Sequence, residues 1–182
     1  VVPQAGHYAG AFSVWQTISL GRTPYLGLLG SLSTIDHEKI DQAVKDVNLE
    51  KLVHRRMAEL SGGERQRVFL ARALAQDTAI MLMDEPTNNL DLSNQMRLMN
   101  LIKHLSQEKG LTTLVAMHDL NLVSRFADYG ILLNQGSILT QGELSKVLSP
   151  EYIQAAFHIK VDVFNHPEEN WPLIFPSRPE NH

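Results

Sequence analysis

An uninterrupted apolar run, residues 80–83, is followed at once by Asp84, Glu85 and Pro86, and this pattern restricts the possible folds more than any other in the chain. A short run of this kind predicts a strand that is buried on both faces, as in a parallel sheet. Pro86 cannot continue the hydrogen-bond ladder of a strand, so both carboxylates are expected at its carboxyl end. Open α/β sheets bind their ligands at that edge, and we therefore expect an α/β fold with a polar site there.

The side chains expected at this edge are suited to metal and phosphate chemistry. One acid of the Asp84 and Glu85 pair can hold Mg²⁺ directly or through water, and the other can polarise an attacking water molecule. A second strand-like run, residues 112–117, ends at His118, which is then expected at the same kind of edge, where it could contact a γ-phosphate. The ordinary alternative is that the acids end a solvated strand and that His118 is a surface residue.

A serine and two glycines, Ser61, Gly62 and Gly63, come directly before a predicted helix over residues 64–75. Ser61 is a favourable N-cap, and the backbone N–H groups of all three residues are expected to be free at the positive end of the helix dipole. This arrangement suits a phosphate group. Such a turn, considered alone, is more often a simple helix cap, so the assignment depends on the other motifs.

Helical and extended patterns alternate through the rest of the chain. Residues 21–25 are predicted to break a helical pattern over residues 12–18, and Asp36 is the predicted N-cap of the next helix. Residues 129–134 and 137–140 are predicted to form a hairpin. The remaining predictions are helices over residues 36–47, 93–109, 120–127, 143–148 and 151–157, and a strand over residues 160–164.

Composition narrows the class of protein. The chain has 182 residues, of which 43% are hydrophobic, and this length favours one main domain. The formal net charge of −4, with both signs dispersed, argues against a nucleic-acid partner. The absence of cysteine excludes disulfides, and no apolar run reaches the roughly 18–20 residues that span a bilayer. We expect a cytoplasmic protein whose role at a membrane depends on a partner.

The serine-glycine turn and the acidic strand end, in this order, resemble motifs of the ATP-binding cassette (ABC) ATPases, the nucleotide-binding subunits of membrane transporters. The resemblance covers most of the chain. It implies that residues 60–66 are the family signature, in which Ser61, Gly62, Gly63 and Gln66 bind the nucleotide.

The same resemblance assigns roles to residues outside the signature. It implies that Asp84 is the Walker B magnesium ligand and that Glu85 is the catalytic base that orients the hydrolytic water. Asp91 is similar to the D-loop residue that bridges two subunits near the nucleotide, and His118 to the switch histidine. Gln4 is similar to the Q-loop glutamine, which acts near the γ-phosphate and the magnesium ion.

The fold implied is α/β: an incomplete P-loop NTPase core, RecA-like and of mainly parallel strands, with an inserted helical subdomain that carries the signature. The expected divisions are residues 1–76 for the Q-loop, helical subdomain and signature helix, 77–150 for the rest of the core, and 151–182 for a C-terminal extension. The cofactors implied are ATP and Mg²⁺. The partners implied are a second ATP-binding subunit, paired head to tail, and transmembrane permease subunits at the inner face of the cell membrane. Neither nucleic acid nor the cargo is expected to bind this chain.

Residues 21–25, 87–91 and 118–122 are similar to the branch of the family that drives import of iron chelates, haem and cobalamin. Residues 22–24 fit a helix-terminating turn equally well.

The chain contains no glycine-rich turn followed by lysine and serine or threonine, which a nucleotide-hydrolysing P-loop needs. The family's P-loop precedes the Q-loop, and Gln4 is already the fourth residue, so the chain resembles a fragment that begins at the Q-loop and is inactive alone. The alternatives are a non-hydrolytic interaction module that docks through residues 5–30 and an ATPase subunit of another ABC transporter class. The lack of basic character argues against a cassette of translation or DNA repair.

Overall fold

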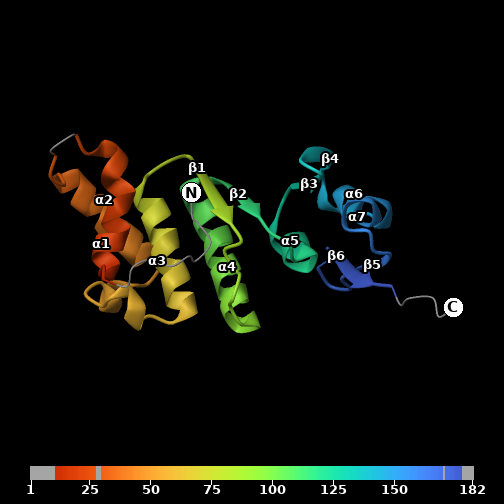
Figure 1. Cartoon of the computed structure of the whole chain (residues 1–182), viewed down its shortest axis with the longest axis horizontal. Helices are drawn as coiled ribbons and strands as arrows, with labels where there is room; N and C mark the ends of the chain where they lie inside the picture. The colour runs from red at the N-terminus through yellow and green to blue at the C-terminus, as the bar shows by residue number, and fades with distance from the viewer. Residues whose placement is uncertain (1–10, 28–29, 170, 178–182) are drawn as a thin grey trace. The chain divides into compact units, whose positions relative to one another are not determined.

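The computed structural model describes residues 11–27, 30–169 and 171–177 (Figure 1). The chain divides into two compact units, Val1–Ala116 and Met117–His182, and each is described by itself. None of the helices in the described ranges is both long and apolar enough to cross a membrane. Gln4 lies outside the described residues.

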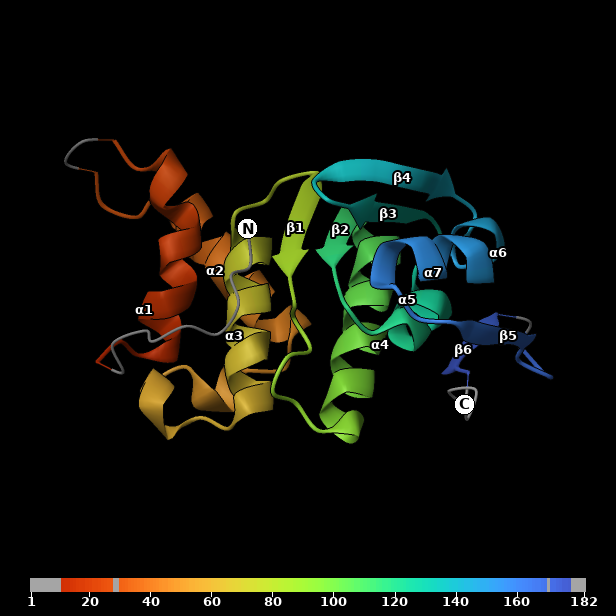
Figure 2. The ribbon, with the colours of Figure 1, turned by 45° about the vertical axis from the view of Figure 1, so that its right-hand side comes forward.

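The first unit begins with a helical part, which consists of α1 (Val14–Ser19), α2 (Thr34–Asp46) and α3 (Gly62–Ala75). The short 3₁₀ helices η1 (Leu20–Tyr25), η2 (Glu50–Leu52) and η3 (Met57–Glu59) connect them. Both α1 and α2 pack on α3 (Figure 2). Fully buried aliphatic side chains form the core between these helices: Val14, Ile18, Ile40, Val47, Leu49, Val68 and Leu70. The core therefore packs against the middle of α3, the predicted signature helix.

One local prediction in this helical part is confirmed and one is wrong. The α-helix α1 ends at Ser19, before residues 21–25, as predicted, and the chain then tightens into the 3₁₀ helix η1. Asp36 is not the N-cap of α2. Ser33 is the cap, and Asp36 completes a capping box by accepting hydrogen bonds from the Ser33 N–H at 2.9 Å and the Ser33 hydroxyl at 2.7 Å.

Strands β1 (Ile80–Asp84) and β2 (Thr112–Ala116) run parallel, with α4 (Leu92–Lys109) between them in the chain (Figure 2). This unit confirms the expected α/β class. The prediction that β1 is buried on both faces is wrong: Met81 and Met83 are each 4% exposed, whereas Ile80 is 59% and Leu82 is 41% exposed. The reason is that, among the described residues, the elements of this unit cover only one face of the two-stranded sheet.

The second unit contains α5 (Leu120–Phe126), α6 (Leu144–Val147) and α7 (Pro150–Phe157). Strands β3 (Gly130–Asn134) and β4 (Ser137–Gly142) form the predicted antiparallel hairpin, and β5 (Val161–Asn165) pairs antiparallel with β6 (Pro172–Pro176). Pro150 is the first residue of α7, where a proline costs no hydrogen bond. The buried cluster of this unit consists of Leu148, Ile153, Val161 and Ile174.

Candidate functional site

The turn before α3 is held by a reciprocal capping box. The Ser61 hydroxyl accepts the Glu64 N–H at 3.3 Å, and the Ser61 N–H donates to Glu64 Oε2 at 2.8 Å. The expectation of three free N–H groups is therefore wrong for Ser61, because the Glu64 carboxylate takes its N–H. Gly62 and Gly63 are the first two residues of the helix, where backbone N–H groups have no acceptor inside the helix.

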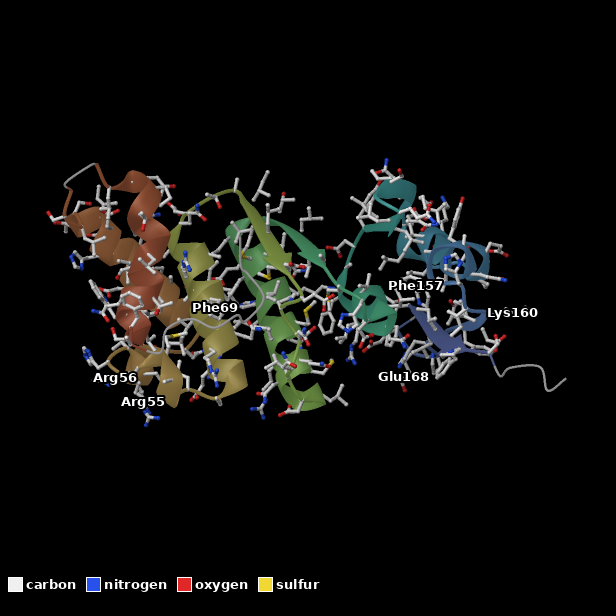
Figure 3. All side chains as sticks on the ribbon, in the orientation of Figure 1. Arg55, Arg56, Phe69, Phe157, Lys160 and Glu168 are labelled. Atoms are coloured by element: carbon white, nitrogen blue, oxygen red, sulfur yellow. The ribbon has the colours of Figure 1, made fainter. Side chains whose placement is uncertain are left out.

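The charge of Glu64 is stabilised by this box. The Ser61 backbone N–H, then the Ser61 hydroxyl, lower the pKa of Glu64, and the positive charges of Arg67 and Arg55 lower it further. Arg55 lies below the start of α3 in the view of Figure 3. Glu64 thus remains ionised while it caps the turn.

Gly63 lets this turn approach the first turn of α4, and Gly62 lies beside the segment that precedes α4. A Cβ atom at Gly62 would lie 3.4 Å from Leu90 Cδ2, and a Cβ atom at Gly63 would lie 3.1 Å from Asn94 Oδ1. The second distance is shorter than an ordinary contact, so a side chain at Gly63 would displace Asn94. The structure therefore brings the predicted signature turn against the predicted D-loop.

Asp91 is the N-cap of α4. Its Oδ1 accepts the Asn94 N–H at 2.8 Å, and its Oδ2 accepts Asn94 Nδ2 at 2.8 Å. The Asn94 backbone N–H, followed by its side-chain amide, lowers the pKa of Asp91. The preceding turn is fixed by the Thr87 carbonyl, which accepts from the Leu90 N–H at 3.3 Å and from Gln95 Nε2 at 3.4 Å. The carboxylate is consequently held in one orientation beside the signature turn.

A cavity of about 280 Å³ lies between the starts of α3 and α4. It is lined by Ser61, Gly63, Glu64, Arg67, Asn94, Arg97 and Leu98. Sequence reasoning missed Arg67 and Arg97, although each follows a predicted site residue, Ser61 or Asp91, by less than two helical turns. Two cations and two helix N-termini favour an anion here, and the Glu64 carboxylate opposes it. A larger cavity, about 340 Å³, lies at the opposite ends of these helices and contains none of the predicted site residues.

The acidic pair lies where the sequence places it, at the carboxyl end of β1. Asp84 is the last residue of the strand and is exposed. Glu85 has a left-handed backbone with φ of 47°, and its N–H donates to the Ala116 carbonyl at 3.0 Å. A residue other than glycine in this region is uncommon, and such residues concentrate at functional sites. The Glu85 backbone is thus tied to the end of β2 in an unusual conformation.

Two predicted site residues are not among these groups. Gln66 is 3% exposed, so its side chain lies in the interior of the first unit and does not line the cavity. His118 belongs to the second unit, where it is exposed and precedes Asp119, the N-cap of α5. The structure therefore brings together Ser61, Gly62, Gly63 and Asp91, with Asp84 and Glu85 in the same unit.

The chain is similar to known proteins in sequence and in fold. The ABC transporter family model matches residues 1–88. The iron(3+)-hydroxamate import ATP-binding protein FhuC of Bacillus subtilis is 35% identical over 173 residues, which are 95% of this chain and 64% of that protein. An uncharacterized ABC transporter ATP-binding protein of Methanocaldococcus jannaschii is 40% identical over 177 residues, 96% of this chain and 66% of that protein. The chain thus spans slightly less than two thirds of the length of these curated relatives.

A solved structure shows the same fold. An ABC transporter in an inward-facing conformation matches with a TM-score of 0.85 and 29% sequence identity. The match covers 97% of this chain and 70% of the other.

Proposed function

The chain belongs to the ABC transporter family, and we propose that it supplies the signature and catalytic residues of an importer's ATP-binding subunit, which couples ATP hydrolysis to uptake of iron-siderophore, haem or cobalamin-type cargo. The observation that carries this proposal is the junction of the Gly62 and Gly63 turn with the capped start of α4, beside a cavity with two arginines. The names of the relatives support the class of cargo.

The signature turn would act on ATP held by a second subunit. The N–H groups of Gly62 and Gly63 and the hydroxyl of Ser61 suit the γ-phosphate, because they lie at the positive end of α3. Asp91, held next to that turn, would bridge the two subunits of a head-to-tail dimer. The burial of Gln66 favours support of the helix start over direct contact with the nucleotide.

The acidic pair would carry out the chemistry. Asp84 suits Mg²⁺, because proteins usually hold this ion through one or two carboxylates together with substrate phosphates. No cluster of three metal-binding side chains occurs in the described ranges. The magnesium ion would neutralise charge on the phosphates. Glu85 would accept a hydrogen bond from the attacking water and orient it, and its fixed backbone limits the positions that the carboxylate can take. His118 and Gln4 would complete the group around the γ-phosphate.

The helical part would receive the membrane partner. Phe12, which precedes α1, and Leu20 and Tyr25, the first and last residues of η1, are 47%, 39% and 52% exposed. Apolar side chains of this kind suit a transmembrane permease subunit. We place the chain on the cytoplasmic face of the membrane, with residues 1–76, 77–150 and 151–182 as its functional divisions. Neither nucleic acid nor the cargo would contact it.

Steady-state hydrolysis by the 182-residue chain is the first test. We expect negligible turnover, because the sequence contains no glycine-rich turn followed by lysine and serine or threonine. A measurable rate that Glu85→Gln abolishes would show that the chain hydrolyses ATP by itself and would refute its dependence on a second subunit.

Complementation is the second test. The chain is added to an intact importer ATPase of the same branch, inactivated at its own signature serine. We expect partial recovery of turnover with the unmodified chain and with Ser137→Ala, an exposed serine of β4, and no recovery with Ser61→Arg. Recovery that survives Ser61→Arg would contradict the proposal that the signature turn acts on ATP held by a second subunit. Binding to a permease without any recovery would favour the interaction-module alternative.

A further inference from the structure

The edge of β6 that faces away from β5 has few backbone hydrogen-bond donors. Trp171 and Ser177 flank β6 and bond to residues that flank β5. The Trp171 carbonyl accepts the His166 N–H at 2.9 Å, and the Ser177 N–H donates to the Lys160 carbonyl at 2.9 Å. Because backbone groups alternate in direction along a strand, Pro172, Ile174 and Pro176 face the opposite side, toward α5 in the same unit. Proline has no N–H, so Ile174 supplies the donor on this edge within Pro172–Pro176.

Two side chains of α5 complete that edge. Asn121 Oδ1 accepts the Ile174 N–H at 2.8 Å, and Asn121 Nδ2 donates to the Ile174 carbonyl at 3.1 Å. The Ser124 hydroxyl donates to the Pro172 carbonyl at 2.6 Å, and Ser124 is 3% exposed. The amide of Asn121 thus takes the place of a neighbouring strand residue and ties α5 to a segment about fifty positions later in the chain.

Helix α5 needs such an anchor. It has seven residues, far fewer than the roughly 12–15 that an isolated helix requires in water. Its N-cap is Asp119, whose Oδ1 accepts the N–H groups of Asn121 and Leu122 at 3.0 Å each. Leu120 packs against the buried cluster that contains Ile174. His118 immediately precedes the cap, so the backbone that presents His118 is held by the same contacts that dock α5 on β6.

We propose that Asn121 and Ser124 are positioning residues for His118, and that the β5–β6 pair is the element through which they act. The catalytic meaning of this device rests on the proposed function, in which His118 contacts the γ-phosphate. The positioning itself is a property of the second unit. It assigns a role to Asn121, which belongs to one of the stretches similar to the importer branch, residues 118–122, and to the C-terminal extension.

Nuclear magnetic resonance of the full 182-residue chain tests this device without nucleotide. The readouts are the imidazole and backbone resonances of His118 and the amide hydrogen exchange of α5. Asn121→Ala should shift the His118 resonances and accelerate exchange in α5 by about tenfold, since both bonds to Ile174 are lost. Ser124→Ala should produce a smaller change in the same direction.

Two controls separate positioning from general stability. Asn134→Ala removes a side-chain amide bond to a backbone carbonyl in the same unit, to Ala155 at 3.2 Å, but not one made by α5. Leu132→Val shortens a buried side chain of β3 in the same unit, 8% exposed, which lies outside the cluster that contains Ile174. Both should leave the His118 resonances in place while the unit stays folded.

The proposal is overturned if Asn121→Ala leaves His118 and α5 unchanged, or if the controls move the His118 resonances equally. Should Asn121→Ala unfold the second unit, Ser124→Ala decides: a shift at His118 supports the proposal, and no shift overturns it. Because neither readout uses ATP, failure of the transport ATPase assignment would leave this result standing, and the reverse also holds.

Discussion

Replacing Gly21 by alanine should separate η1 from α3, the helix that carries the signature turn. A Cβ atom at Gly21 would lie 2.3 Å from the backbone oxygen of Arg72 and 3.2 Å from Ala75 Cβ. Relaxed carbon–oxygen contacts are about 3.3 Å, so the two backbones must move apart by about 1 Å. The obstacle is a helix backbone, which cannot rotate away as a side chain can.

The cost follows from what this separation disturbs. Overpacking of a dense interior costs about 1–3 kcal/mol, and a backbone clash belongs at the upper end of that range. The same movement stretches the bond from Arg22 Nη1 to the Ala75 carbonyl, which is 3.0 Å long and buried. We therefore expect Gly21→Ala to lower the free energy of unfolding of the first unit by about 3 kcal/mol.

Urea denaturation followed by tryptophan fluorescence measures this loss. The chain has two tryptophans, Trp15 in the first unit and Trp171 in the second, so a Trp171→Phe background makes the signal report the first unit. Gly27→Ala is the matched control, because a Cβ atom there meets nothing within 4 Å. A Gly21→Ala chain within about 0.5 kcal/mol of its parent would refute the packing argument, as would an equal loss in Gly27→Ala.

Two further predictions concern caps. The hydrogen bonds from the Ser33 hydroxyl, the Ser33 N–H and Arg22 lower the pKa of Asp36 from 3.8 to about 2. A lowered folded-state pKa contributes stability that is present above pH 4 and is lost as the pH falls toward 2. Asp36→Asn should therefore reduce the dependence of the urea midpoint on pH between pH 4 and 2. An unchanged dependence would count against the capping box. Ser61→Ala should cost about 1 kcal/mol and Ser61→Gly only a few tenths, measured by the same denaturation, and equal losses would contradict capping by the hydroxyl.

Much of the fold follows from local sequence. Helix α4 begins and ends within one residue of its predicted bounds, because Asp91 caps one end and Gly110, with φ of 62°, closes the other. The β3–β4 hairpin turns at Gln135 and Gly136, between the two predicted strands, and both residues have positive φ. The acids at the end of β1 are likewise a local feature, since Pro86 ends the strand after them. The roles of the site residues remain predictions.

The amino-acid sequence by itself determined the cap at Ser61, the strand that ends at Asp84 with Glu85 directly after it, and the turn at Gly62 and Gly63. Those features depend on neighbours within four residues, whose steric and hydrogen-bonding preferences are visible in the chain. Only the tertiary structure decided that Gly62 and Gly63 lie beside Leu90 and Asn94, that β1 exposes one apolar face, and that Asn121 pairs with Ile174. Contacts between residues fifty positions apart depend on how whole elements pack, and no local pattern encodes them.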